Sequence, residues 1–137
     1  MATAGPNAPG TMADDNAVGT VTWDTPDNAK VNDTNYTFIG AGQSHYLKAT
    51  GFGFSIPSGA TINGVAVGVT RKAADSSKFA YAADVIIKIV KGGTVLGSNY
   101  AVGTKWPTSD GTVTYGGAAD LWGTTFADTD INASDFG

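Results

Sequence analysis

The stretch 50–71 constrains the fold more than any other part of the chain, because its apolar residues fall two apart in two consecutive runs. The first run is Phe52, Phe54 and Ile56, and the second is Val65, Val67 and Val69. A period of two is the side-chain repeat of a β-strand. Pro57-Ser58-Gly59 separates the runs and predicts a tight turn. Ala66 and Gly68 are too small to form a polar solvent face, so we expect a central strand whose back is covered.

Composition favours an all-β protein of one domain. The chain has 137 residues, of which 19 are glycine and only 15% are charged, as is typical of strands joined by many turns. A net charge of −4 with scattered lysines gives no basic face for nucleic acid. The absence of cysteine excludes disulfides and thiolate metal sites. We find no signal peptide and no apolar segment of transmembrane length, so no membrane contact is predicted.

Further extended segments recur along the chain and are separated by turn residues. They cover 20–23, 36–39, 43–54, 84–91, 94–96 and 112–115, and Gly92-Gly93 is a hairpin signal. Residues 1–17 have almost nothing to bury, which predicts a flexible or partner-ordered arm. The predicted fold is therefore all-β: a single β-sandwich, jelly-roll-like, over residues 18–137, preceded by this arm.

Three groups of residues resemble a known module. They are Trp23 with Pro26 and Asn28, GFGFSIPSGATINGVAVGV at 51–69, and DLWG at 120–123 with DINASDFG at 130–137. Together they are similar to a β-sandwich module of phage virion structural proteins, tail-associated, fibre and decoration proteins among them, and of related bacterial surface repeats. The resemblance covers residues 18–137. Its motifs are structural and carry no catalytic residue across, so it implies a fold and a setting.

The setting implied by this resemblance is a viral particle assembled in the host cytoplasm. The chain would be a non-enzymatic structural subunit, and its partners would be copies of itself and other virion proteins. In the module an apolar strand follows the FG, whereas this sequence stops at Gly137, so we expect an open sheet edge that another chain could complete. The predicted interface residues are Met1, Pro6, Pro9, Met12, Trp106, Phe136 and Gly137.

Two other functions remain open, a carbohydrate-binding surface module and a subunit of an extracellular filament. Aromatic rings can stack on sugars, and sandwich folds host such modules. Trp23 and Trp122 lie in patterned segments where burial is expected, because a large ring fills the space between sheets. Trp106, before Pro107, is the tryptophan expected to be exposed. Cell-surface carbohydrate is therefore a possible partner, recognised through Trp106.

Catalytic and metal chemistry find little support in the sequence. His45 is the only histidine, and no nucleophile motif accompanies it, so we expect a surface or partly packed residue. Asp14 and Asp15 fall in the arm and are expected to be solvated. Asp128, Asp130, Asn132 and Asp135 have the oxygen-rich spacing of a calcium loop, but Ala133 stands at its glycine position. A short helix over 128–134, capped by an aspartate, explains these residues without an ion. No cofactor and no enzymatic activity are predicted.

Overall fold

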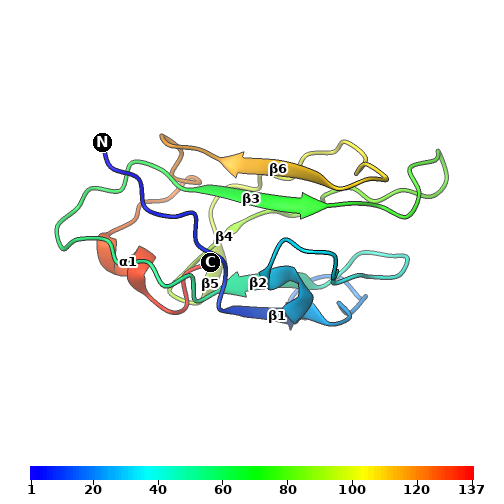
Figure 1. Ribbon diagram of the computed structural model, residues 1–137, viewed down its shortest axis with the longest axis horizontal. Coiled ribbons are helices and arrows are strands. Elements are labelled where there is room, and N and C mark those ends of the chain that lie inside the picture. The colour runs from blue at the N-terminus through cyan, green and yellow to red at the C-terminus, as the bar shows by residue number, and fades with distance from the viewer. The chain divides into compact units, whose positions relative to one another are not determined.

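The structure is a small β-rich fold, as the composition predicts. The computed structural model describes residues 1–137, with 25% of the chain in strands and 7% in helix. Six strands form three separate two-stranded sheets, accompanied by one 3-10 helix and one short α-helix (Figure 1). None of the helical segments has the length and apolar character needed to cross a membrane.

The chain divides into two compact units, each made of segments that are discontinuous in sequence. Unit 1 comprises Met1–Ala60, Val90–Val95 and Ala127–Gly137, and unit 2 comprises Thr61–Ile89 and Leu96–Phe126. The strands β4 (Ile89–Lys91) and β5 (Thr94–Leu96) form a two-stranded hairpin, and its residues Val90–Val95 belong to unit 1. Gly92 and Gly93 have φ angles of 57° and 73°, which confirms the predicted turn.

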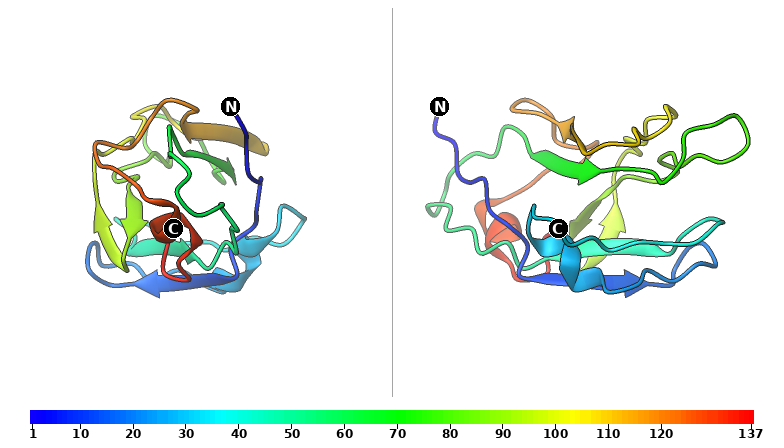
Figure 2. Two further views of the ribbon diagram at one scale, coloured as in Figure 1. Left: turned by 90° about the vertical axis from the view of Figure 1, so that its left-hand side faces the viewer. Right: turned by 45° about the vertical axis from the view of Figure 1, so that its right-hand side comes forward.

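Unit 1 begins with a strand where the sequence predicted an arm. β1 (Thr11–Asp15) pairs antiparallel with β2 (Tyr46–Thr50), and Figure 2 shows the two strands side by side. Within the arm predicted over residues 1–17, residues 11–15 are therefore a strand, whereas 1–10 and 16–17 lie outside helices and strands. The reason is that β1 is held by backbone pairing and by its aspartates, neither of which needs the apolar side chains that the segment lacks.

The core of unit 1 is aromatic. The rings of Phe52, Phe54 and Phe136 lie 6.2–6.3 Å apart between centroids, and Phe136 is buried. Beside them, α1 (Asp128–Asn132) buries Ile131. The Asn132 side chain donates to the Ile56 carbonyl at 2.9 Å and accepts from the Ile56 amide at 2.7 Å. This pair of bonds fixes the helix to the segment that leads into the predicted Pro57–Gly59 turn, which is closed by a bond from the Ala60 amide to the Pro57 carbonyl.

Unit 2 contains the strand on which the sequence prediction centred. β3 (Ala66–Arg71) pairs antiparallel with β6 (Gly111–Gly116), with Val67 opposite Tyr115 and Val69 opposite Val113. Both strands fall where alternation predicted them. The prediction of a central strand with a covered back was wrong, because β3 has a partner on one side only and Ala66 and Gly68 are exposed. Other predicted segments are shorter: 20–23 and 36–39 contribute only isolated bridges, at Val21 and Phe38, and 84–91 is a strand only from residue 89.

Trp122 is the largest fully buried side chain, and the backbone around it is closely fitted. Its indole Nε1 donates to the Val65 carbonyl at 2.9 Å, and its ring lies 4.6 Å from that of Tyr100. Gly116 has a φ angle of 69°, and a Cβ at this position would overlap the Val65 carbonyl and the Trp122 indole. Gly116 is therefore required both by backbone conformation and by space.

Replacing Gly116 by alanine should destabilise the protein by about 2–4 kcal/mol, because a left-handed φ and an overlap are combined at one position. Gly117→Ala is the matched control, since its Cβ would have no neighbour within 4 Å; we expect a change within about 0.5 kcal/mol. Urea unfolding of both variants measures the difference. Equal stability of the two variants would contradict the close fit around Trp122.

Candidate functional site

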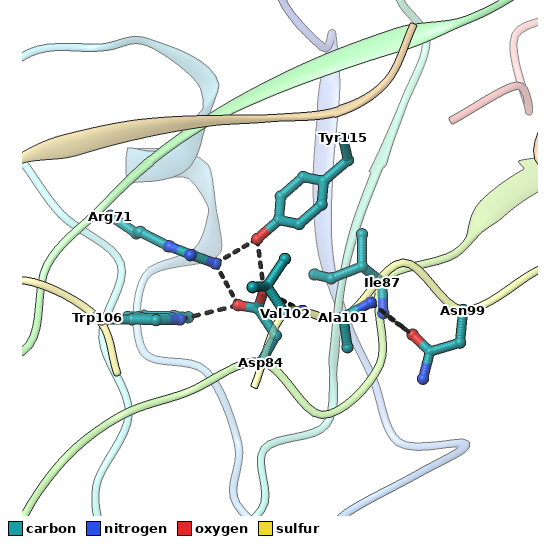
Figure 3. A network of polar contacts seen from close by, with 8 residues as sticks. All are labelled: Arg71, Asp84, Ile87, Asn99, Ala101, Val102, Trp106 and Tyr115. Atoms are coloured by element: carbon teal, nitrogen blue, oxygen red, sulfur yellow. Dashed lines mark hydrogen bonds and ion pairs between the residues drawn. The ribbon is translucent and has the colours of Figure 1, made fainter. Parts of the chain in front are cut away.

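The most extensive polar cluster lies in unit 2 and centres on Asp84, whose side chain is fully buried (Figure 3). One carboxylate oxygen accepts from the Arg71 guanidinium and from the Trp106 indole at 2.8 Å. The other accepts from the Tyr115 hydroxyl at 2.6 Å and from the Val102 amide at 3.1 Å. Arg71 also donates to the Tyr115 hydroxyl oxygen. We call these five residues the Asp84 network.

The network keeps Asp84 ionised despite its burial. Burial alone would raise the pKa of Asp84, but hydrogen bonds from Tyr115, Arg71 and Trp106 outweigh it and leave the pKa below the ordinary value. The pKa of Tyr115 is raised, first by its own burial and then by its bond to the Asp84 carboxylate. A carboxylate that accepts four donors has no lone pair directed at a substrate, so this site stabilises the fold.

The residues of the network come from three parts of unit 2. Arg71 ends β3 and Tyr115 lies in β6, whereas Asp84, Val102 and Trp106 come from the connecting loops. The Arg71 guanidinium lies 5.2 Å from the Trp106 ring centroid and 5.7 Å from that of Tyr115, so cation–π contacts add to the hydrogen bonds. The network therefore fixes two loops to the β3–β6 sheet.

Residues 74–81, which we call the Phe79 loop, are exposed along their whole length. Phe79 is 92% exposed and Tyr81 is 57% exposed. Lys105 holds the loop by donating to the carbonyls of Ser76 and Ser77 at 3.2 and 2.7 Å, and its ammonium lies 4.8 Å from the Tyr81 ring centroid. The Trp106 amide donates to the Ala82 carbonyl at 2.8 Å. Two exposed aromatic side chains are thus presented by a loop whose base is anchored.

In unit 1, the structure brings His45 together with Asp14, which the sequence placed in an arm. His45 Nδ1 lies 2.7 Å from the Asp14 carboxylate, which also accepts the Trp23 amide at 2.8 Å. The bond with His45 is the main cause that lowers the pKa of Asp14. Asp15 pairs with Lys48 at 2.9 Å. The expectation of solvated aspartates was therefore wrong, because both side chains link β1 to residues around β2.

An aspartate–histidine pair is the orienting half of a hydrolytic triad, but a nucleophile must complete it. No serine, threonine or tyrosine hydroxyl is hydrogen-bonded to the His45 ring. The Trp23 indole donates to the His45 carbonyl at 2.9 Å, so the histidine takes part in the packing of Trp23. The side chains of His45 and Asp14 are partly buried, which agrees with the prediction of a surface or partly packed histidine.

Three of the four candidate calcium residues, Asp128, Asp130 and Asn132, lie in α1, and Asp135 follows it. Asp130 accepts the Ala127 amide at 2.8 Å, which lowers the pKa of its carboxyl group, and pairs with Lys91 at 3.2 Å. The N-cap residue is Ala127, so the aspartate acts from within the first turn and not from the cap position predicted for it. No group of three or more His, Asp or Glu side chains is placed to hold a metal ion.

The predicted interface residues lie in different environments. Met1 and Pro6 are exposed, and Pro9 and Met12 are half-buried, with Met12 in β1 opposite Ala49. Phe136 is buried, and Gly137 exchanges backbone hydrogen bonds with Val90. The prediction of an open edge at these last two residues was therefore wrong, because Val90 occupies that edge.

The three tryptophans differ from one another. Trp122 is buried as predicted, whereas Trp23 is only half-buried. Trp106 was expected to be exposed but is half-buried, since Asp84 takes its N–H and Arg71 lies over its ring. A sugar-stacking platform at Trp106 would need that ring free, so this geometry disfavours the carbohydrate hypothesis at this residue.

Sequence reasoning missed the Asp84 network altogether. A signal was present: Arg71 ends the apolar run of β3, and Asp84 directly precedes the apolar run 85–87. A charge at each end of consecutive apolar segments indicates a buried ion pair, because such charges lie close to the core. Tyr115 could have been added from the alternation of β6, which places it on the same face as Val113.

Asp84→Asn should destabilise the protein by about 3–5 kcal/mol at neutral pH, because it leaves Arg71 buried without its counter-ion. Since the pKa of Asp84 is lowered in the folded state, its contribution is full above the unfolded pKa near 4 and is lost as pH falls through the folded value. The variant should therefore lose less stability than the wild type on acidification. Tyr115→Phe, which removes one donor, should cost about 1–2 kcal/mol.

Urea unfolding between pH 7 and pH 2 measures both effects. Asp27→Asn is the control, because it removes an exposed ion pair with Lys30 that contributes little. If Asp84→Asn and Asp27→Asn had the same stability at neutral pH, the Asp84 network would not hold the fold of unit 2.

Comparison of the chain with protein-family models, with curated proteins and with solved structures gave no match.

Proposed function

We propose that this protein is a non-enzymatic structural subunit of a viral particle, acting through self-association and attachment to a larger assembly. The viral setting is supported by the resemblance of residues 18–137 to virion modules. Self-association is supported by the exposed aromatic side chains of the Phe79 loop. The same resemblance and the recurrence of short strands support a jelly-roll-like β-sandwich as its fold.

The Phe79 loop is the observation that carries the proposal. Phe79 is almost fully exposed, and Tyr81 is more than half exposed. Large aromatic side chains exposed together are unfavourable in water and are characteristic of protein–protein contacts, where aromatic anchors supply much of the binding energy. Val85, next to Asp84 in the sequence, and Val102, a member of the network, are exposed by 57% and 39% and extend the apolar character of this unit's surface.

The way in which the loop is held strengthens this argument. Ser77 Oγ accepts the Ala80 amide at 3.0 Å, Asp75 accepts the Ser77 amide at 2.8 Å, and Lys105 binds the loop carbonyls. A loop ordered before binding loses less conformational entropy when it binds. An anchored loop with exposed aromatic residues therefore favours a contact surface over a flexible connection.

The filament alternative uses the same surface and differs only in the origin of the protein. The carbohydrate alternative is less favoured, because the half-buried Trp106 already contacts Arg71 and Asp84. The structural role is the function that the geometry supports best.

The purified chain should self-associate with increasing concentration, and Phe79→Ser/Tyr81→Ser should weaken this association at least about tenfold, as expected when aromatic anchors are removed. Light scattering over a dilution series measures the mass, and electron microscopy of the concentrated sample shows the form of the assembly.

Val31→Ser is the matched control, because Val31 is 65% exposed in unit 1 and lies outside the loop. It should leave the association unchanged. A wild-type chain that stays monomeric at every concentration would contradict self-association. Equal weakening by both substitutions would show that the Phe79 loop is not a specific contact.

A further inference from the structure

The β3–β6 sheet has two strands only, so each has a partner on one side and none on the other. A strand edge without a partner presents a row of N–H and C=O groups that can bind another strand. Along β6, Thr112 and Thr114 are exposed, and so are Ala66 and Gly68 along β3. Both outer edges are accessible in this unit.

The ladder shows which backbone groups face outward. The Gly117 amide donates to the Val65 carbonyl at 3.0 Å, one step beyond the Ala66–Gly116 pair and in the same register. Hydrogen-bonded pairs alternate along an antiparallel ladder, so the Val69–Val113 pair is bonded and the intervening residues point outward. The backbone groups of Thr112 and Thr114 therefore point away from β3, and they make no hydrogen bond within the protein.

The chemistry of the β6 edge favours pairing with a strand. Natural sheets protect exposed edges with charges, proline or bulges. β6 reads GTVTYG and has neither charge nor proline, and the one charge of β3, on Arg71, is buried in the Asp84 network. The β1–β2 sheet of unit 1 differs, because Asp14, Asp15 and Lys48 lie along it.

We infer that the outer edge of β6 is the contact between two copies of this chain, which pair antiparallel into a continuous four-stranded sheet. The inference deepens the proposed function and rests on it. A two-fold axis at Val113 places Thr112 opposite Thr114 of the second copy, so two Thr–Thr pairs form and no like charges meet across the axis. Cross-strand threonine pairs and β-branched residues both favour sheet formation.

Amide hydrogen exchange on the wild-type chain tests this pairing without a substitution. Exchange is followed by NMR at a dilution where light scattering shows a monomer and at a concentration where it shows an oligomer. The Thr112 and Thr114 amides should exchange fast in the monomer and at least about tenfold more slowly in the oligomer. The Val113 amide, bonded to Val69 within one chain, should be protected in both.

Thr112→Lys/Thr114→Lys supplies a second test, because it places lysines opposite each other across the two-fold axis. We expect at least about tenfold weaker association with an unchanged monomer fold, checked by thermal unfolding. Ala66→Lys is the matched control, since it adds a charge to the same face of the sheet at the opposite edge. It should leave association unchanged.

The outcomes separate this inference from the proposed function. An oligomer in which the Thr112 and Thr114 amides remain unprotected would overturn the β6 contact and leave self-association standing. Equal weakening by the Ala66 and the threonine substitutions would assign the contact to the sheet face, which also overturns the inference. A chain that is monomeric at every concentration would overturn both proposals.

Discussion

The buried carboxylate of Asp84 is the interaction on which the structure of unit 2 depends. A charge in this environment is stable only when its oxygens are satisfied, and four donors from two strands and one loop satisfy them. Arg71 depends on Asp84 in turn, because its guanidinium is also buried and needs the carboxylate as counter-ion. The pair therefore couples the end of β3 to the loop that carries Trp106 and to the segment that follows the Phe79 loop.

Alternation in the sequence was sufficient to predict β3 and β6, because Val67 and Val69 share one face of the sheet with Val113 and Tyr115, while the other face carries small or polar residues. It was insufficient for β1, whose pairing uses the backbone and two aspartates. Alternation also predicted longer strands at 20–23 and 84–91 than the structure contains. An extended segment becomes a strand only where a partner segment lies in register. Local periodicity describes one segment, whereas pairing depends on two segments that are distant in the sequence.

The candidate site was even harder to predict from local sequence, because its residues are far apart along the chain. Asp84, Arg71 and Tyr115 are 13 to 44 residues apart in pairwise sequence separation. The charges beside the apolar runs suggest burial of Arg71 and Asp84, but they do not show which residues pair. The same holds for His45 and Asp14, which are 31 residues apart. By contrast, a short helix beginning at Asp128 was predictable because its aspartates act over only three residues, although the bond from the Ala127 amide goes to Asp130 in the first turn and not to an aspartate at the N-cap. Interactions that close within one turn are visible in the sequence; long-range polar pairs become visible only in the fold.

The two contacts that we propose for unit 2 differ in chemistry, and this difference bears on the kind of assembly. One two-fold contact closes a dimer and allows no further growth. A subunit that builds an extended particle needs a second contact. The contact proposed at the Phe79 loop is chemically unlike the β6 edge, because it offers aromatic side chains in place of unpaired backbone groups. Both surfaces are linked to the Asp84 network, since Arg71 and Tyr115 lie in the sheet while the Trp106 amide bonds the Ala82 carbonyl next to the Phe79 loop. Loss of this buried ion pair would therefore weaken both contacts together, whereas a surface substitution would affect only one.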